Sequence, residues 1–534
     1  MSIRKYTIPI PKQNIALRQV SGHSYVYFIT GYYRNKKGTP THKSVSIGKL
    51  DPSNPRLMYP NDNYFVWFDA EDKSVEKVKP SQIFSAGKTV FLGMRLEQLG
   101  VTKLLEKIFP GYYQQIIQMA IFIVCQDAIM MYLNDFYEEH LPLYSSIPNP
   151  NHLNKIYESL TKDLRWDFFE EWQQVALGNE KEAIAYDVTS ISTTSKDIDL
   201  AEKGYNRDHE RLPQINVGTF YGQQTQLPIC YEIYNGSIPD LSHLPTMMLL
   251  AKELGFLPKV FVMDRGYLSQ DNLTYLKQEN IPFIMAISES VKIYNEAFLA
   301  ASEEIRTYPN YLTKATSYGL QQPLKVNHEL YTLNIYYNSE KANREEIALA
   351  QSIEAREKEL ANLIGKKSRK KQDPFFRITA EKGQVLDYEK DEEGIRQAFQ
   401  LVGMFGILSS EVDMTPEQVL LTYRKRDGIE KLYDNMKNSL DFYRLRVHSS
   451  QAMEGKFFIG FIAQILYADL VRVLWGTDKP PVQTIKKLFI EMDKIKQVTY
   501  TNQKELMTPL TKKQKDILSL FSINADEFRM KIIE

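Results

Sequence analysis

Residues 22–50 alternate apolar and polar side chains, in SYVYFITGYYR and then HKSVSIGKL, on either side of a short turn at 35–38 (NKKG). A period of two is typical of strands with one buried face, and a turn with Asn and Gly joins two strands into a hairpin. Residues 90–180 instead repeat their apolar positions with a helical period. The sequence therefore predicts a small β-rich N-terminal domain over 1–84, followed by a helical domain over 85–180.

The pattern changes again after residue 180. Short strand-like runs follow one another: AIAYDV, QINVGTF, QLPICYEIY, KVFVMD and IPFIMAI. We expect helices at about 243–254 and 269–279, before the last two strands. Three adjacent strands followed by strand–helix alternation describe a mixed α/β sheet. We assign the first part of this core to 181–289 and the second part, which opens with the strand-like GMFGILSS, to 401–478.

Residues 290–400 separate the two parts of the core, and we interpret them as an insertion domain. They contain aromatic strand-like pieces and a charged helix at about 339–364, which ends in a basic run. The sequence TPE then provides an N-cap, a proline at the first helical position and an early acid, so a helix is expected over 416–440. A buried helix follows at 457–475, and the tail, 479–534, contains two small amphipathic helices.

Composition limits the class of protein. Hydrophobic residues make up 43% and charged residues 25% of the 534 residues, as in ordinary soluble proteins. Two cysteines, Cys125 and Cys230, cannot form a disulfide framework and fit a reducing cytoplasm. The apolar stretches at 116–133 and 457–475 contain Gln, Asp or Arg, which favours buried helices over membrane spans. We expect a cytoplasmic protein without a membrane partner.

Charge is unevenly distributed although the formal net charge is zero. Residues 1–50 contain no Asp or Glu, and the first acid is Asp51. Such a segment is either a phosphate-binding surface or a solvated basic face, and charge alone does not separate the two. Its basic residues are Arg4, Lys5, Lys12, Arg18, Arg34, Lys36, Lys37, Lys43 and Lys49.

Two aspartates follow strand-like runs in the core. Asp187 is expected to close the first strand (AIAYDVTS), and Asp264 to close a later one (KVFVMDRGY). Adjacent strand ends in one sheet are rigid and close together, so two carboxylates there can share a cation. An Asp at a strand end is also a common turn former or helix cap, so position alone does not establish a site.

The helix predicted at 416–440 adds a polar stripe. Tyr423, Arg426, Glu430 and Lys437 are spaced by 3, 4 and 7 positions, which places them within about 60° of one another around a helix. The simplest alternative is an exposed Arg–Glu pair. Two-metal phosphoryl chemistry, however, needs this combination, because carboxylates hold Mg²⁺ and nearby cations hold phosphate.

The spacing Y-(2)-R-(3)-E-(6)-K resembles the signature of the insertion sequence four-like superfamily of DDE transposases, found in bacterial insertion sequences. Other segments also resemble that group, in the same order: YDVTS, GYNRDH leading to PQINVG, GSIPD and MDRGY. The resemblance covers about 85–475. Ser237 stands where the group often has Asn.

The resemblance implies an α/β protein with an RNase H-like catalytic core interrupted by an insertion domain. It further implies cleavage at transposon ends and joining of the 3′-hydroxyl to target DNA. Two Mg²⁺ ions per site are expected, with Mn²⁺ able to substitute. The resemblance also implies a homodimer assembled on terminal inverted repeats and target DNA, and association with the bacterial nucleoid when the protein is bound. The expected catalytic carboxylates and metal ligands are Asp187, Asp264 and Glu430, and the expected DNA-binding side chains are Tyr423, Arg426 and Lys437.

Two other functions remain open on the sequence alone. One is an RNase H-like DNA nuclease that cuts without transposing, and the other is a domesticated protein that only binds DNA. The end sequence, the target preference, the duplication length and the excision route are not encoded in these motifs.

Overall fold

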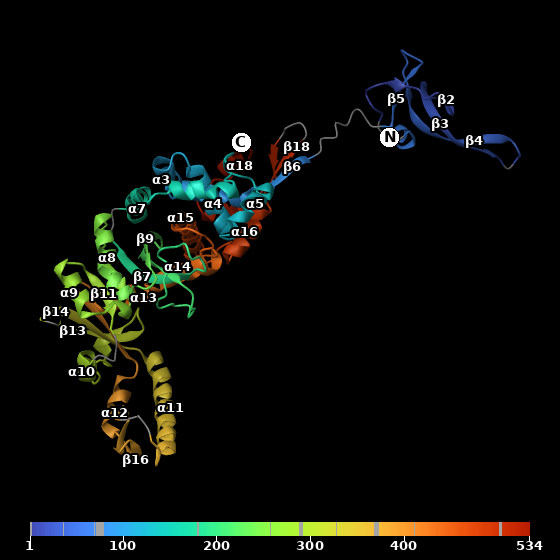
Figure 1. Cartoon of the computed structure of the whole chain (residues 1–534). Helices are drawn as coiled ribbons and strands as arrows, with labels where there is room; N and C mark the ends of the chain where they lie inside the picture. Colours follow the sequence, from blue (N-terminus) through green and yellow to red (C-terminus); the bar gives the residue numbers. More distant parts are fainter. Residues whose placement is uncertain are drawn as a thin grey trace. The chain divides into compact units, whose positions relative to one another are not determined.

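The computed structural model describes residues 3–35, 37–68, 70, 80–178, 181–256, 258–287, 292–326, 328–367, 373–410, 412–500 and 505–533 (Figure 1). The chain divides into two compact units. The first consists of Met1–Gln82 and Val498–Glu505, and the second of Ile83–Gln497 and Leu506–Glu534.

The first unit contains a five-stranded antiparallel sheet in the order β1-β5-β4-β3-β2. Val26, Ile47 and Met58 form its small core, and the ring of Phe28 contacts Trp67 and Phe68. The predicted hairpin is confirmed, although Lys36 in its turn lies outside the described residues. The elements are β1 (Ile8–Pro9), β2 (Ile15–Val20), β3 (His23–Arg34), β4 (Pro40–Leu50), β5 (Leu57–Pro60) and α1 (Asp62–Trp67).

A nine-stranded sheet forms the centre of the second unit, in the order β12-β13-β14-β17-β11-β10-β7-β8-β9. The β7–β10 and β10–β11 pairs are parallel and the other described pairs are antiparallel, so the predicted mixed α/β architecture is confirmed. Every residue of β8 and β10 is buried, as expected for strands covered on both faces. The strands are β7 (Ala183–Ser192), β8 (Gln214–Gly222), β9 (Pro228–Asn235), β10 (Val260–Met263), β11 (Phe283–Ala286), β12 (Tyr311–Leu312), β13 (Ser317–Val326), β14 (Glu329–Tyr337) and β17 (Met404–Ser410). Helices α8 (Asp240–Glu253), α9 (Gln270–Gln278) and α10 (Lys292–Ala301) connect or flank them.

The insertion domain predicted over 290–400 is only partly separate from the core. Its strands β12, β13 and β14 extend the central sheet, because β14 pairs with β17 from Thr332 to Tyr337 and thereby buries Leu333 and Ile335. The remainder has a small core of its own around Ile353 and Phe376. Its elements are α11 (Ser339–Leu363), β15 (Phe376–Glu381), β16 (Gln384–Lys390) and α12 (Glu392–Leu401). Most of the basic run that ends the predicted charged helix lies outside the described residues.

Six α-helices described between residues 87 and 177 precede the central sheet in the chain, and the long helix α15 (Ser450–Trp475) packs with them. Helix α15 packs against α4 and α6, and buried Arg95 of α2 binds fully buried Asp469 of α15. By length and composition α15 could cross a membrane, but 78% of its most apolar window is buried within the protein. The preceding helices are α2 (Gly87–Gln98), α3 (Val101–Ile108), α4 (Tyr113–Cys125), α5 (Leu133–Glu139), α6 (Leu153–Ser159) and α7 (Lys162–Leu177).

The single helix predicted over 416–440 is wrong. The segment forms α13 (Pro416–Arg424), α14 (Asp427–Asp434) and a π-helical turn (Asn435–Ser439). Between α13 and α14 the backbone N–H groups of Arg426, Gly428 and Ile429 each bond three residues back instead of four, which tightens the turn. Gly428 allows the approach to β8, because a Cβ there would lie 2.7 Å from the ring of Tyr221.

The described part of the tail, 479–500 and 505–533, contains three helices, where two were expected. They are α16 (Ile485–Asp493), α17 (Lys512–Leu520) and α18 (Ala525–Ile533). A three-stranded sheet in the order β19-β18-β6 also forms, from β19 (Glu505–Met507), β18 (Lys496–Tyr500) and β6 (Pro80–Ser85).

Candidate active site

Two neighbouring parallel strands position the two aspartates. The prediction that Asp187 closes its strand is wrong, because β7 continues to pair with β8 as far as Ser192. Asp264 does follow the last residue of β10. Val260 pairs with Ala183 and each later residue of β10 keeps the same offset. Continuing this register by two residues beyond Val262 brings Asp264 level with Asp187.

Arg426 joins one aspartate to the predicted catalytic glutamate. Its guanidinium lies 3.6 Å from Asp187 Oδ2 and 2.5 Å from Glu430 Oε1. The Arg426 side chain is 13% exposed, whereas that of Glu430 is 51% exposed and sits at the rim. The tight turn before α14 therefore brings a largely buried cation and a carboxylate toward the middle of β7.

Most of the predicted site residues line one cavity of about 520 Å³. Asp187, Asp264, Arg426, Glu430 and Lys437 are among its lining residues. Tyr423 lies in an adjoining hollow that shares Asp264, and its hydroxyl is 3.4 Å from Asp264 Oδ1. The structure thus brings all six predicted residues to two hollows that meet at Asp264.

The described lining of the cavity has a formal charge of −3, because it includes six acids and three bases. Negative charge in a partly enclosed space attracts divalent cations. The acids are Asp187, Asp208, Asp240, Asp264, Glu430 and Asp434, and the bases are Arg207, Arg426 and Lys437.

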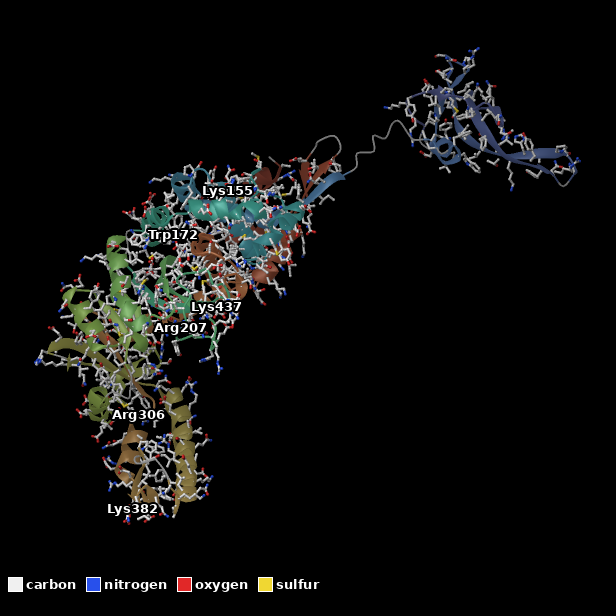
Figure 2. All side chains as sticks on the ribbon, in the orientation of Figure 1. Lys155, Trp172, Arg207, Arg306, Lys382 and Lys437 are labelled. Atoms are coloured by element: carbon white, nitrogen blue, oxygen red, sulfur yellow. The ribbon has the colours of Figure 1, made fainter. Side chains whose placement is uncertain are left out.

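Several lining residues had not been assigned a role from the sequence. Arg207 forms an ion pair with Asp240, and Lys437 Nζ lies 2.6 Å from Asp208 Oδ2. Figure 2 labels Arg207 and Lys437 in the same part of the second unit. Arg207 and Asp208 lie in the motif GYNRDH, and Asp240 lies in GSIPD. These motifs were therefore the signal in the sequence that could have identified the three residues.

Two tyrosines hold the strand that carries Asp187. The Tyr433 hydroxyl donates to the backbone oxygen of Asp187 at 2.7 Å. The Tyr267 hydroxyl lies 3.4 Å from Asp187 Oδ1, and the Val188 N–H donates to the same oxygen at 2.8 Å. These contacts hold both the backbone and the carboxylate of Asp187.

Burial dominates the electrostatics of Asp187. It raises the pKa of this carboxyl to about 6, although Arg207, Arg426 and the Val188 N–H lower it. A cation bound beside the carboxylate would offset the cost of keeping its charge away from water. Burial likewise raises the pKa of Tyr423 to about 12, so its phenol stays protonated and able to donate a hydrogen bond.

The donor set fits a hard divalent ion. Mg²⁺ prefers oxygen ligands, and the aspartates supply them from level positions on adjacent strands. Among the described residues, no three His, Cys, Asp or Glu side chains already surround a common point. Instead, the Arg426 guanidinium lies between Asp187 and Glu430 and pairs with both carboxylates.

A comparison with known protein families identifies the family of this chain. A family model described as a transposase DDE domain matches residues 178–466, more than half of the chain. The chain belongs to this family. The matched range contains every predicted site residue and both halves of the central sheet. The protein is thus a DNA transposase of a family that uses divalent metal ions.

One solved structure gives this transposase a distant match. The cryo-electron microscopy structure of the piggyBac transposase synaptic complex with hairpin DNA shares 11% sequence identity. The match covers 79% of this chain and 75% of that one, with a TM-score of 0.33, and similarity at this level supports no conclusion. No curated protein matches the transposase.

Proposed function

We propose that this transposase cleaves transposon ends and joins the freed 3′-hydroxyl to target DNA by two-metal phosphoryl transfer. Asp187, Asp264 and Glu430 are the proposed metal ligands. The observation that carries the proposal is the register of β7 and β10, which levels the two aspartates while Arg426 links Asp187 to Glu430 in one cavity.

The proposed reaction needs no external energy source, because each step forms one P–O bond and breaks one. Water attacks a backbone phosphorus at the transposon end, one P–O bond forms, and the bond to the 3′-oxygen breaks. The 3′-hydroxyl then attacks a target phosphodiester. Its oxygen bonds to phosphorus, the bond from that phosphorus to the target's 3′-oxygen breaks, and the target strand leaves with the proton as a free 3′-hydroxyl. When bound, two Mg²⁺ or Mn²⁺ ions would assist the attacking and leaving oxygens.

Arg426 is suited to hold the DNA backbone beside the carboxylates. Its buried Nε has no hydrogen-bond partner among the described residues, and a phosphate oxygen would supply one. Lys437 and the protonated hydroxyl of Tyr423 add a cation and a donor on either side. We assign these three side chains to the DNA strand.

The order of the strands supports an RNase H-like core. The first aspartate lies on the first core strand, the second follows the fourth, and the glutamate lies on a later helix. This arrangement is the one implied by the resemblance of the sequence motifs.

A strand-transfer assay tests the proposed function. The full chain is incubated with Mg²⁺, linear DNA that ends in the terminal inverted repeats of its element, and a target plasmid. Joined product supports the proposal, cutting without joining identifies a nuclease, and binding alone identifies a DNA-binding protein. Asp264→Asn should remove activity, whereas Asp271→Asn, at an exposed position on α9, should not. A mass corresponding to two chains on the DNA complex is expected from light scattering.

A further inference from the structure

The outer part of the β3–β4 hairpin stands apart from the rest of its sheet. β2 pairs with β3 only from His23 to Phe28, and β5 pairs with β4 only from Gly48 to Leu50. Within the described residues, 31–34 and 40–43 therefore pair only with each other. We call the described residues 30–35 and 37–43 the arm. Figure 1 shows it extending beyond the other strands of its unit.

An isolated two-stranded ribbon is marginally stable in water. None of the described arm residues belongs to the hydrophobic core of the first unit. The arm nevertheless carries two exposed aromatic side chains, Tyr32 at 73% and Tyr33 at 48% exposure. A ribbon with this composition gains stability when a partner covers it.

The charge of the arm identifies the kind of partner. Arg34, Lys37 and Lys43 are exposed, and no Asp or Glu occurs before Asp51. The Arg34 guanidinium donates to the Gly38 backbone oxygen, which holds it across the turn. A surface with cations, aromatic rings and no acids is complementary to a polyphosphate strand.

The strand register defines the face that is open. Tyr32 pairs with His42, and their rings lie 6.3 Å apart. From β2, Arg18 reaches His42 at 3.0 Å and Ser44 at 2.9 Å, so these side chains share one face of the sheet. The opposite face carries Phe28, which packs against α1. The polar and aromatic face is thus the one that α1 leaves uncovered.

We propose that the arm enters the major groove of duplex DNA. The open face, with Arg18 of β2 and with Tyr32 and His42 of the arm, would meet base edges, while Arg34 and Lys43 contact phosphates. Strands lie about 4.8 Å apart, so a two-stranded ribbon with its side chains fits a groove about 12 Å wide but not one about 6 Å wide. The proposal rests on the proposed function only in taking DNA as the partner, because no catalytic residue takes part.

The salt dependence of binding tests the phosphate contacts. The full chain is titrated with a mixed-sequence DNA duplex in EDTA, so cleavage plays no part. Each lost phosphate contact should make the log–log salt slope shallower by about 0.9, so Arg34→Gln with Lys43→Gln should change it by about 1.8. The matched control replaces two exposed cations of the second unit, Lys358→Gln with Arg396→Gln, and should leave the slope unchanged.

Two further measurements test the groove and the face. Tyr32→Ala should weaken binding about tenfold without changing the slope. Methyl green, which occupies the major groove, should displace the full chain from the duplex, and netropsin, which occupies the minor groove, should not. The conservative pair Arg34→Lys with Lys43→Arg should bind as the original chain does, which separates lost contacts from an unfolded hairpin.

Three results would overturn the proposal. These are an unchanged slope and affinity in the arm variants, displacement by netropsin alone, and a loss of self-association in sedimentation with DNA binding intact. The last result would make the arm a contact between two copies of the chain. Binding in EDTA that survives while strand transfer fails would count against the proposed function and leave the arm proposal standing.

Discussion

Asp187 shows how one side chain can be held in place at an electrostatic cost. Burial raises its pKa to about 6, and Tyr267 and the Val188 N–H fix its position. A shift of this size means that the folded chain disfavours the charged form that a metal requires. A metal ion bound at the proposed site would therefore remove a cost that the fold itself creates.

Asp187→Asn should abolish strand cleavage and leave DNA binding intact. The amide keeps the shape of the side chain and loses the charge that holds a cation. Cleavage is measured on labelled transposon ends with Mg²⁺, and binding by a gel shift in EDTA. Mg²⁺-dependent cutting near the rate of the unmodified chain would refute the role of this residue.

Arg426→Ala and Lys437→Ala should impair strand transfer more than they lower stability. A cation beside a reacting phosphate stabilises charge in the transition state, and its loss should cost about 10²–10³ in rate, by analogy with oxyanion donors. Both cations are mostly buried, at 13% and 11% exposure, but their carboxylate partners Glu430 and Asp208 are 51% and 27% exposed, so water can solvate the carboxylate that each substitution leaves behind. Strand-transfer rates and thermal unfolding midpoints of each variant separate the two effects.

Lys431→Ala is the matched control on the same helix. Lys431 forms an exposed pair with Asp427 four residues earlier, as Glu430 does with Arg426, but it does not line the cavity of the predicted carboxylates. Its removal should change neither measurement. Equal damage from Lys431→Ala would show that α14 presents a different face to the DNA.

At the scale of elements, periodicity predicted the strands of the core well. The runs AIAYDV and KVFVMD became β7 and β10, because continuous apolar strands are buried on both faces. Sequence reasoning failed where partners decide the outcome. β7 runs past Asp187 because β8 pairs with it to Ser192, and β12–β14 join the sheet because β17 lies beside β14.

The prediction of the candidate site likewise succeeded where local spacing decides and failed where tertiary contacts decide. Spacing placed Arg426 and Glu430 on one helical stripe, and both line the cavity. The break before α14 arises from a tight turn and the contact of Gly428 with Tyr221, which a helical period does not reveal. The pairing of Lys437 with Asp208 is equally a tertiary contact, since 229 positions separate the two residues.

Asp493, the last residue of α16, should make the free energy of unfolding depend on pH. Although burial alone raises the pKa of Asp493, hydrogen bonds from His140, Lys88 and Ser85 lower it to about 2. A lowered carboxyl pKa stabilises the fold above the unfolded value, near 3.8, and that stability is lost as pH falls toward 2. Asp493 is 36% exposed, so we discount the effect to about 1 kcal/mol.

Asp493→Asn should therefore lower the thermal unfolding midpoint at pH 7, and the difference should vanish near pH 2. Unfolding followed by circular dichroism across this range provides the measurement. Asp478→Asn, at an exposed position, should show no such difference. A gap that persists unchanged at pH 2 would mean that the Asp493 contacts do not depend on its charge.

At the scale of the whole molecule, a net charge of zero conceals a separation of charge. The first fifty residues are basic without an acid, whereas the cavity of the second unit carries −3. Each feature suits a different partner: phosphates for the first and divalent cations for the second.

Mg²⁺ should consequently stabilise the folded chain even without DNA. A ligand that binds only the folded state adds about 2.7 kcal/mol when its concentration is one hundred times its Kd. The thermal unfolding midpoint should rise with Mg²⁺ in the original chain and in Asp478→Asn. It should not rise in the double variant Asp187→Asn with Asp264→Asn. The same rise in the double variant would place the bound ion elsewhere.

The place of β17 in the central sheet also has a consequence for the time at which the chain becomes active. Chains fold as they leave the ribosome, from the N-terminus onward. β7, β10 and their aspartates emerge early, but β17 must insert between β11 and β14 before α14 can deliver Glu430. A partly synthesised chain lacks one of its three proposed carboxylates, so we infer that a ribosome-bound intermediate cannot cut DNA and that activity begins only when translation is nearly finished.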